Sequence, residues 1–123
     1  MDKPRVLLVE DEEVLKEVYS ESLSADGMEI EYAKDGDEAL AKMKKGGYAL
    51  VLLDVMLPKK DGIQIVKELK KDPPKESNKK IVFMTNLAQE NLLKEGQEYG
   101  VSDVLIKTDY TPDTFLTKVK SFL

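Results

Sequence analysis

The sequence predicts an α/β fold in which a five-stranded parallel sheet is covered by helices on both faces. Short apolar runs alternate strictly along the 123 residues with longer segments whose apolar residues recur at helical spacing. The connections between these segments are short, and the sequence contains no internal repeat, linker or low-complexity stretch. Strict alternation of this kind is typical of parallel strands that are joined by right-handed helical crossovers.

Five short runs predict the strands. The run over residues 48–53 is the most apolar stretch of the chain, as expected for a central strand that is covered on both faces. The run over residues 28–33 alternates apolar and acidic side chains, as expected for a half-buried edge strand. The predicted strands cover residues 6–9, 28–33, 48–53, 81–85 and 104–106.

Five amphipathic segments predict the helices. Asp35 and Asp61 each precede an acid or an amide by three positions, which predicts a capping box at the start of a helix. Thr111 followed by Pro112 predicts a cap with proline at the first helical position. The predicted helices cover residues 12–26, 35–45, 61–71 and 90–99, and the last helix runs from residue 112 almost to residue 123.

The apolar character of the strands also predicts their order in the sheet. The first, third and fourth runs are continuously apolar and belong in the centre, whereas the second belongs at an edge. This placement favours the flavodoxin-like order 2-1-3-4-5, a three-layer βα sandwich. In such sheets the functional crevice lies at the carboxyl ends of the strands, beside the switch point between strands 1 and 3.

Composition excludes several kinds of chemistry. The chain has no Cys and no His, which excludes disulfides, thiol nucleophiles, imidazole bases and zinc sites built on these residues. A metal site would therefore be all-oxygen and would suit Mg²⁺, Mn²⁺ or Ca²⁺. The net charge of −5 argues against direct nucleic-acid binding through a basic face.

Length and hydropathy bear on domain organisation and location. We expect one domain over residues 1–123 with no output domain. The longest apolar run, residues 49–53, is too short to cross a bilayer, and the first residues show no signal-peptide pattern. We therefore expect a cytoplasmic protein without membrane insertion.

Polar residues follow four of the predicted strands at the edge where a site is expected. The positions are Glu10 and Asp11 after the first strand, Asp54 after the third, Thr85 at the end of the fourth and Lys107 after the fifth. Clustered carboxylates favour a bound divalent cation, and a carboxylate oxygen can act as a nucleophile towards phosphorus. A hydroxyl and an ammonium beside them suit a transferred phosphoryl group. Each residue alone has a structural explanation, such as a helix cap or a surface lysine, but their coincidence at one edge favours a site.

Residues 6–12 and 52–62 carry a resemblance that extends over the whole chain. The sequence resembles the receiver domain of two-component response regulators, and it is similar to the stand-alone regulators of chemotaxis and of the sporulation phosphorelay. The resemblance implies that Asp54 accepts a phosphoryl group and that Thr85 and Lys107 contact it. It also implies a Mg²⁺ site, with Mn²⁺ as a second candidate ion. The implied metal ligands are the side chains of Glu10, Asp11 and Asp54 and the backbone carbonyl of Met56.

The resemblance further implies the partners. The phosphoryl donor would be a phosphohistidine on a sensor histidine kinase or on a histidine phosphotransfer protein. A downstream target would dock on the fourth helix, fifth strand and fifth helix, and Tyr99 and Tyr110 are the candidate exposed anchors there. The chain would then be a phosphoacceptor switch, catalysing only its own phosphorylation and dephosphorylation. The other residues expected on this output surface are Lys94, Glu98, Lys118 and Lys120.

Three positions depart from the family pattern. Thr108 stands after the site lysine where the family usually has proline, Leu105 stands where an aromatic residue is common, and Asn86 stands where a small residue is usual. Thr108 and Asn86 leave open a second reading of the chain, a pseudo-receiver that binds partners without phosphotransfer.

Two further classes of protein fit the sequence less well. Phosphatases of the haloacid dehalogenase-like class carry a second Asp two residues after the nucleophile, where this chain has Met56. A flavodoxin-like cofactor carrier would need phosphate-binding glycines or hydroxyls after the first strand, where this chain is acidic.

Overall fold

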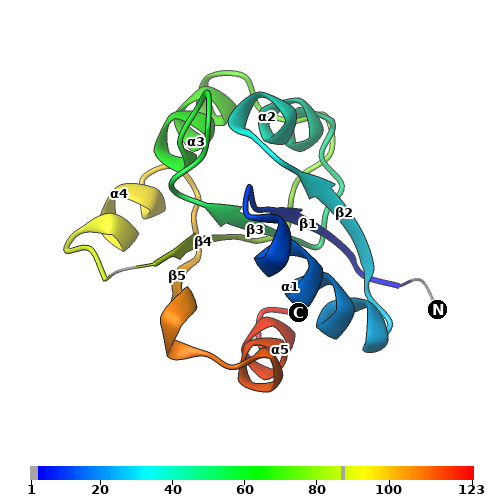
Figure 1. Cartoon of the computed structure of the whole chain (residues 1–123). Coiled ribbons are helices and arrows are strands. Elements are labelled where there is room, and N and C mark those ends of the chain that lie inside the picture. Colours follow the sequence, from blue (N-terminus) through cyan, green and yellow to red (C-terminus); the bar gives the residue numbers. More distant parts are fainter. Residues whose placement is uncertain (1–2, 87) are drawn as a thin grey trace.

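The computed structural model describes residues 3–86 and 88–123 and shows a parallel five-stranded sheet in the order β2-β1-β3-β4-β5. Helices cover both faces of the sheet (Figure 1). The strands are β1 (Arg5–Val9), β2 (Glu29–Ala33), β3 (Leu50–Asp54), β4 (Ile81–Thr85) and β5 (Asp103–Ile106). The helices are α1 (Glu13–Ala25), α2 (Gly36–Lys45), α3 (Gly62–Lys71), α4 (Leu92–Gln97) and α5 (Pro112–Lys120), with a 3₁₀ turn over Lys107–Asp109. The predicted fold class and strand order are confirmed.

Two hydrophobic clusters hold the layers together, one on each face of the sheet. Alternate residues of β1 point to opposite faces, so Leu7 and Val9 join one cluster whereas Val6 and Leu8 join the other. The first cluster packs against α2, α3 and α4, and the second packs against α1 and α5 (Figure 1). Because both faces are covered, the central strands can be continuously apolar.

Side-chain caps fix where three of the helices begin. Asp61 and Thr111 form complete capping boxes with the residues three positions later. At α2 the cap is one-sided: the Asp35 carboxylate accepts a hydrogen bond from the Glu38 backbone N–H at 2.9 Å, and Glu38 does not complete the predicted box. The caps at Asp35 and Asp61 fix the starts of α2 and α3, the two helices that flank the carboxyl end of β3.

The helix predicted over residues 90–99 is shorter in the structure. α4 spans only Leu92–Gln97, because it starts after Asn91 in a left-handed conformation (φ 68°) without a side-chain cap. At its other end the Tyr99 N–H donates to the Gly96 carbonyl, which tightens the chain out of the helix. Gly96 is required there because a Cβ would lie 2.7 Å from the Phe83 ring.

The remaining boundaries differ by a few residues. β3 begins at Leu50 instead of residue 48, and α5 ends at Lys120. None of the helices within residues 3–86 and 88–123 has both the length and the apolar character needed to cross a membrane.

Candidate functional site

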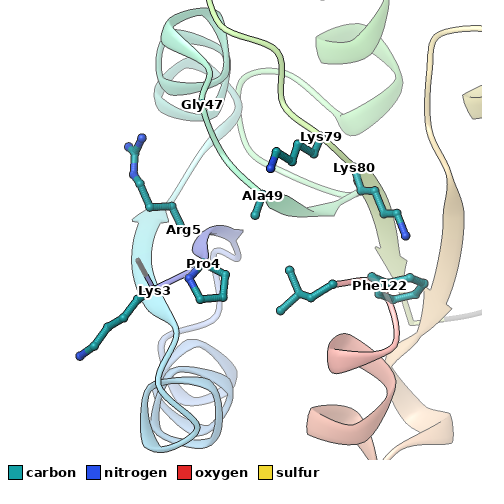
Figure 2. Close-up of a pocket in the computed structure, with 9 residues that line it drawn as sticks. Lys3, Pro4, Arg5, Gly47, Ala49, Lys79, Lys80 and Phe122 are labelled. Atoms are coloured by element: carbon teal, nitrogen blue, oxygen red, sulfur yellow. The ribbon is translucent and has the colours of Figure 1, made fainter. Parts of the chain in front are cut away.

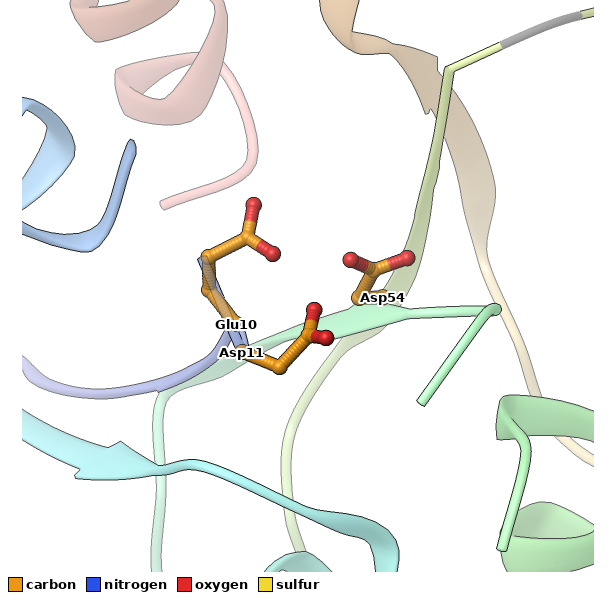
Figure 3. Close-up of side chains that lie close together, drawn as sticks. All are labelled: Glu10, Asp11 and Asp54. Atoms are coloured by element: carbon orange, nitrogen blue, oxygen red, sulfur yellow. The ribbon is translucent and has the colours of Figure 1, made fainter. Parts of the chain in front are cut away.

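Three carboxylates converge at the carboxyl ends of β1 and β3. Glu10 and Asp11 directly follow β1, and Asp54 is the last residue of β3. One oxygen from each of these side chains lies within 4.8 Å of the others, and Figure 3 shows the three side chains facing a common space. The convergence follows from the parallel register, in which Val9 pairs with Leu53 and so places Glu10 beside Asp54. The predicted acidic cluster is therefore present.

Lys107 connects two of these carboxylates. Its ammonium donates hydrogen bonds to Glu10 Oε1 at 2.6 Å and to Asp54 Oδ2 at 2.7 Å. All three side chains are nearly inaccessible to solvent. The explanation of Lys107 as one more surface lysine is wrong, because the end of β5 places it inside the cluster.

The pKa values of Glu10 and Lys107 are both raised in this cluster, for different reasons. Burial, reinforced by the neighbouring Asp54, raises the pKa of Glu10 to about 7, although Lys107 opposes the shift. Burial alone lowers the pKa of Lys107, but its hydrogen bonds to Asp54 and Glu10 outweigh that effect and leave this pKa raised. The site thus favours an additional positive charge, which would stabilise ionised Glu10.

The donor set fits a hard divalent cation. Glu10 is buried, and its Oε2 atom has no hydrogen-bond partner among the described residues. Asp11 is exposed, so the cluster is open to solvent on one side. Carboxylate oxygens with an open side suit Mg²⁺, which retains several waters when protein-bound, and they also suit Mn²⁺. Glu10, Asp11 and Asp54 would hold such an ion.

The loop after β3 also contacts Asp54. The Met56 backbone N–H donates to Asp54 Oδ1 at 3.1 Å, while the Met56 side chain is 69% exposed. The carboxylate of Asp54 is therefore held from both sides, by Met56 on Oδ1 and by Lys107 on Oδ2. That the Met56 carbonyl binds the metal stays a prediction.

Thr85 occupies the expected edge of the sheet. It is the last residue of β4 and is 2% exposed. The preceding residue, Met84, pairs with Asp54 in the sheet, so Thr85 follows at the level of the acidic cluster. The structure places all five predicted side chains at one end of the sheet.

The three departures from the family pattern have structural correlates. The peptide bond between Lys107 and Thr108 is trans, and the two residues start the 3₁₀ turn. The Thr108 hydroxyl donates to the Asn86 carbonyl at 3.4 Å, so the loops after β4 and β5 are in contact. Leu105 is 1% exposed and belongs to the core cluster on the α1–α5 face, and the Asn86 side chain is exposed.

The start of α2 contacts the loop after β3. The sequence did not predict these contacts. The Gly36 N–H donates to the Pro58 carbonyl at 3.0 Å, and the Lys59 ammonium lies 3.4 Å from the Asp35 carboxylate. A Cβ at Gly36 would lie 2.2 Å from the Lys60 carbonyl oxygen, so glycine permits this close approach. In the sequence, Asp35 and Gly36 carried only the signal of a helix start.

A second missed residue lies beneath the cluster. Tyr19 of α1 is buried and stacks on Phe115 of α5 with ring centroids 4.2 Å apart. Burial raises the pKa of Tyr19, and the charges of Lys107 and Glu10 are close enough to contribute. The helical periodicity indicated only a core residue at this position.

The expected exposed anchors of the output surface are not exposed. Tyr99 is half-buried against the core beneath α3 and α4, and the ammonium groups of Lys67 and Lys70 lie 5.8 and 5.6 Å from its ring centroid. Tyr110 is half-buried against the opposite cluster. The expectation that both aromatics are exposed is therefore wrong, whereas their contact with a target stays a prediction.

The fold and the acidic cluster at the carboxyl ends of β1 and β3 define a flavodoxin-like α/β domain of the CheY type. Residues 6–120 match the response regulator receiver domain, and the chain belongs to that family. Family members take part in two-component signalling, interact with histidine kinases or phosphotransfer proteins, and bind Mg²⁺ at an acidic pocket.

Individual relatives agree with this assignment. The chain is 32% identical over its whole length to the probable transcriptional regulator ycf27 of Porphyridium aerugineum and 31% identical over 99% of its length to the transcriptional regulatory protein ResD of Bacillus subtilis. Each alignment covers 49% of the relative, so the chain spans about half the length of the curated relatives it matches.

Solved structures show the same fold. The chemotaxis protein CheY4 of Vibrio cholerae is 29% identical with a TM-score of 0.84, covering 99% of this chain and 100% of that one. The Francisella response regulator 1452 receiver domain is 26% identical with a TM-score of 0.81, covering 98% and 96%.

Proposed function

We propose that the chain accepts a phosphoryl group on Asp54 from a phosphohistidine of a partner protein, in a Mg²⁺-dependent reaction, and that phosphorylation changes its contacts with a target. The observation that carries this proposal is the setting of Asp54. Its carboxylate lies at the end of β3 beside two further acids, and Lys107 and the Met56 N–H bind its two oxygens. A carboxylate that is oriented beside an acidic pocket suits nucleophilic attack on phosphorus.

In the proposed transfer an Asp54 oxygen attacks the phosphorus atom of the phosphohistidine. A bond between phosphorus and the Asp54 oxygen forms while the bond between phosphorus and the imidazole nitrogen breaks. The leaving imidazole keeps the electron pair and takes up a proton. The residues here do little covalent chemistry themselves, because phosphoryl transfer depends mainly on positioning and charge stabilisation.

Lys107 and Thr85 support the transferred group in this proposal. The Lys107 ammonium already lies 2.7 Å from Asp54 Oδ2 and can shift to a phosphoryl oxygen without leaving the pocket. Thr85, at the end of the neighbouring strand, has a hydroxyl suited to donate to another phosphoryl oxygen. Mg²⁺ bound by Glu10, Asp11 and Asp54 would supply further positive charge to the phosphoryl oxygens.

The same proposal makes the chain a switch with no substrate other than itself and its donor. The input partner is a sensor histidine kinase or a histidine phosphotransfer protein. The output surface is the face formed by α4, β5 and α5, which continues from Thr85 and Lys107 at the ends of β4 and β5. Contacts on that face would depend on exposed charged residues, since Tyr99 and Tyr110 are half-buried.

Intact mass spectrometry tests the proposal. The protein is incubated with phosphoramidate, with and without Mg²⁺, as wild type, as Asp54→Asn and as Asp61→Asn, a control in the same loop that keeps its capping ability. We expect one added phosphoryl group in the wild type and the control, dependent on Mg²⁺, and none in Asp54→Asn. Phosphorylation of Asp54→Asn would overturn the assignment, as would a wild-type chain that takes up no phosphoryl group and binds neither Mg²⁺ nor beryllofluoride.

A further inference from the structure

A second hollow lies at the opposite end of the sheet from the acidic site. It opens at the amino ends of β1, β3 and β4 (Figure 2). Its volume is about 600 Å³. The acidic cluster lies at the carboxyl ends of these strands, so the two sites are separated by the length of the sheet. The lining residues are Lys3, Pro4, Arg5, Gly47, Ala49, Lys79, Lys80, Phe122 and Leu123.

Three lysines line this hollow without an ion-pair partner among the described residues. Lys3, Lys79 and Lys80 are exposed, and none of them forms an ion pair within the part of the chain that the structure describes. The lysines of the loop after β3 differ, because Lys59 pairs with Asp35 and Lys60 with Glu68. The three ammonium groups are therefore available to an anion, and the carboxylate of Glu76 lies beside Gly47 at the edge of the hollow.

Arg5 has a different role in the hollow. Its guanidinium is paired with Glu31 at 2.6 Å and lies 4.7 Å from the Tyr48 ring centroid. The charge of Arg5 is therefore balanced by Glu31, and the three lysines are the groups that attract an anion.

The backbone that carries two of the lysines is fixed. The Lys79 N–H donates to the Tyr48 carbonyl, and the Lys80 carbonyl accepts from the Val51 N–H, both at 2.9 Å. Figure 2 shows the Lys79 side chain directed past Ala49 and the Lys80 side chain extending beside Phe122. Cations on an ordered backbone lose less conformational freedom on binding than cations on a loose loop.

One wall of the hollow is apolar. Pro4 and Ala49 line it together with Phe122 and Leu123, and Leu123 is 49% exposed. An apolar wall beside free cations suits a ligand with an anionic group joined to a ring. The volume lies in the range of small-molecule sites, whereas an extended acidic peptide is usually bound along a groove or a sheet edge.

We propose that this hollow is a second ligand site, which takes a small phosphorylated molecule with an apolar ring, of the nucleoside diphosphate class. The anionic groups are bound by Lys79, Lys80 and Lys3, and the ring lies against Pro4 and Phe122. Binding here does not involve Asp54, so this proposal and the proposed phosphoryl transfer can fail independently.

Titration with adenosine diphosphate in metal-free buffer tests the proposal, with backbone amide chemical shifts as the readout. We expect the largest shifts at Ala49, Lys79 and Lys80, and weaker binding of inorganic phosphate or adenosine alone. The double variant Lys79→Ala/Lys80→Ala should raise the dissociation constant at least about tenfold, since each lost charged hydrogen bond has an effect of that order. The control Lys70→Ala/Lys71→Ala removes an equal charge elsewhere. It should change the dissociation constant for adenosine diphosphate by less than about twofold.

Three results would overturn the proposal. The first is a set of shifts spread evenly over the lysines of the chain, and the second is an equal loss of binding in the two double variants. Either result would mean unspecific attraction between charges. The third is binding of an eight-residue glutamate peptide at the hollow while adenosine diphosphate gives no shifts, which would make the hollow a peptide-docking surface instead.

Discussion

Lys107 and Asp54 are 53 positions apart in sequence, yet the Lys107 ammonium lies 2.7 Å from Asp54 Oδ2 and both side chains are buried. The same ammonium lies 2.6 Å from Glu10 Oε1. One cation thus compensates two buried carboxylates at the centre of the site. Stability and chemistry are therefore coupled at Lys107, because the charge that would stabilise a transferred phosphoryl group also pairs with both buried carboxylates.

Lys107→Ala should destabilise the fold. The substitution leaves two buried carboxylates without their cation, and removal of one partner of a buried ion pair costs about 3 kcal/mol. Urea unfolding at mildly alkaline pH measures the effect. Mg²⁺ should stabilise the variant more than the wild type, because the more negative pocket binds the cation more tightly. Lys120→Ala, which breaks an exposed pair with Asp26, should cost less than about 1 kcal/mol. Equal unfolding free energies for the two variants would contradict the role given to Lys107.

Gly36→Ala should disturb the loop that carries Met56. The new Cβ would lie 2.2 Å from the Lys60 carbonyl oxygen, so the backbone of the loop must move. We expect a loss of about 1–3 kcal/mol in unfolding free energy, as for other overpacked positions, together with weaker Mg²⁺ binding measured by calorimetry. Asp37→Ala, at the neighbouring exposed position, is the matched control and should leave Mg²⁺ affinity unchanged. If Gly36→Ala binds Mg²⁺ as tightly as wild type, α2 does not position the loop.

Tyr48 should make stability depend on alkaline pH. Burial, with the hydrogen bond to Glu31, raises the pKa of Tyr48 from its ordinary value of 10 to about 12. Between these pH values the unfolded chain loses the phenolic proton while the folded chain keeps it, so unfolding becomes easier as pH rises. The contribution is complete below pH 10, and about 2–3 kcal/mol is lost by pH 12.

Urea unfolding of wild type and Tyr48→Phe across this range isolates the effect, because all other groups titrate in both proteins. The wild type should lose stability more steeply than the variant. Parallel pH profiles would show that the Tyr48 hydroxyl ionises equally well in the folded and unfolded chains.

Leu105 should behave as a core residue. It is 1% exposed and lies in the cluster that includes Phe115 and Val119, so it occupies fixed space beneath the site. Leu105→Ala should lower the unfolding free energy by about 3 kcal/mol. Val14→Ala, a truncation at an apolar position that is 72% exposed, should cost less than about 0.5 kcal/mol. A small effect of Leu105→Ala would show that this position repacks freely.

Much of the fold could be predicted because its signals are local. The apolar run of β3 and the alternation in β2 indicate a central and an edge strand, and Asp61 and Thr111 mark the helix starts that they cap. The convergence of Glu10, Asp11 and Asp54 could also be predicted, because parallel strands bring their carboxyl ends to one edge.

Contacts that depend on tertiary placement could not be predicted. The hydrogen bond of Gly36 to Pro58 and its close approach to Lys60 depend on how α2 packs against the loop after β3. No local sequence pattern encodes that packing. The partly buried position of Tyr99 depends on Lys67 and Lys70 of α3, which are distant from it in sequence. The early end of α4 likewise depends on the packing of Gly96 against Phe83.

Chemical trapping can locate the phosphoryl group on Asp54. The protein is phosphorylated in Mg²⁺ and then reduced with borohydride, which converts an aspartyl phosphate into homoserine, and its proteolytic fragments are sequenced by mass spectrometry. We expect homoserine at position 54 and at no other carboxylate. Homoserine at position 11, or a phosphorylated chain with unmodified Asp54, would contradict this expectation.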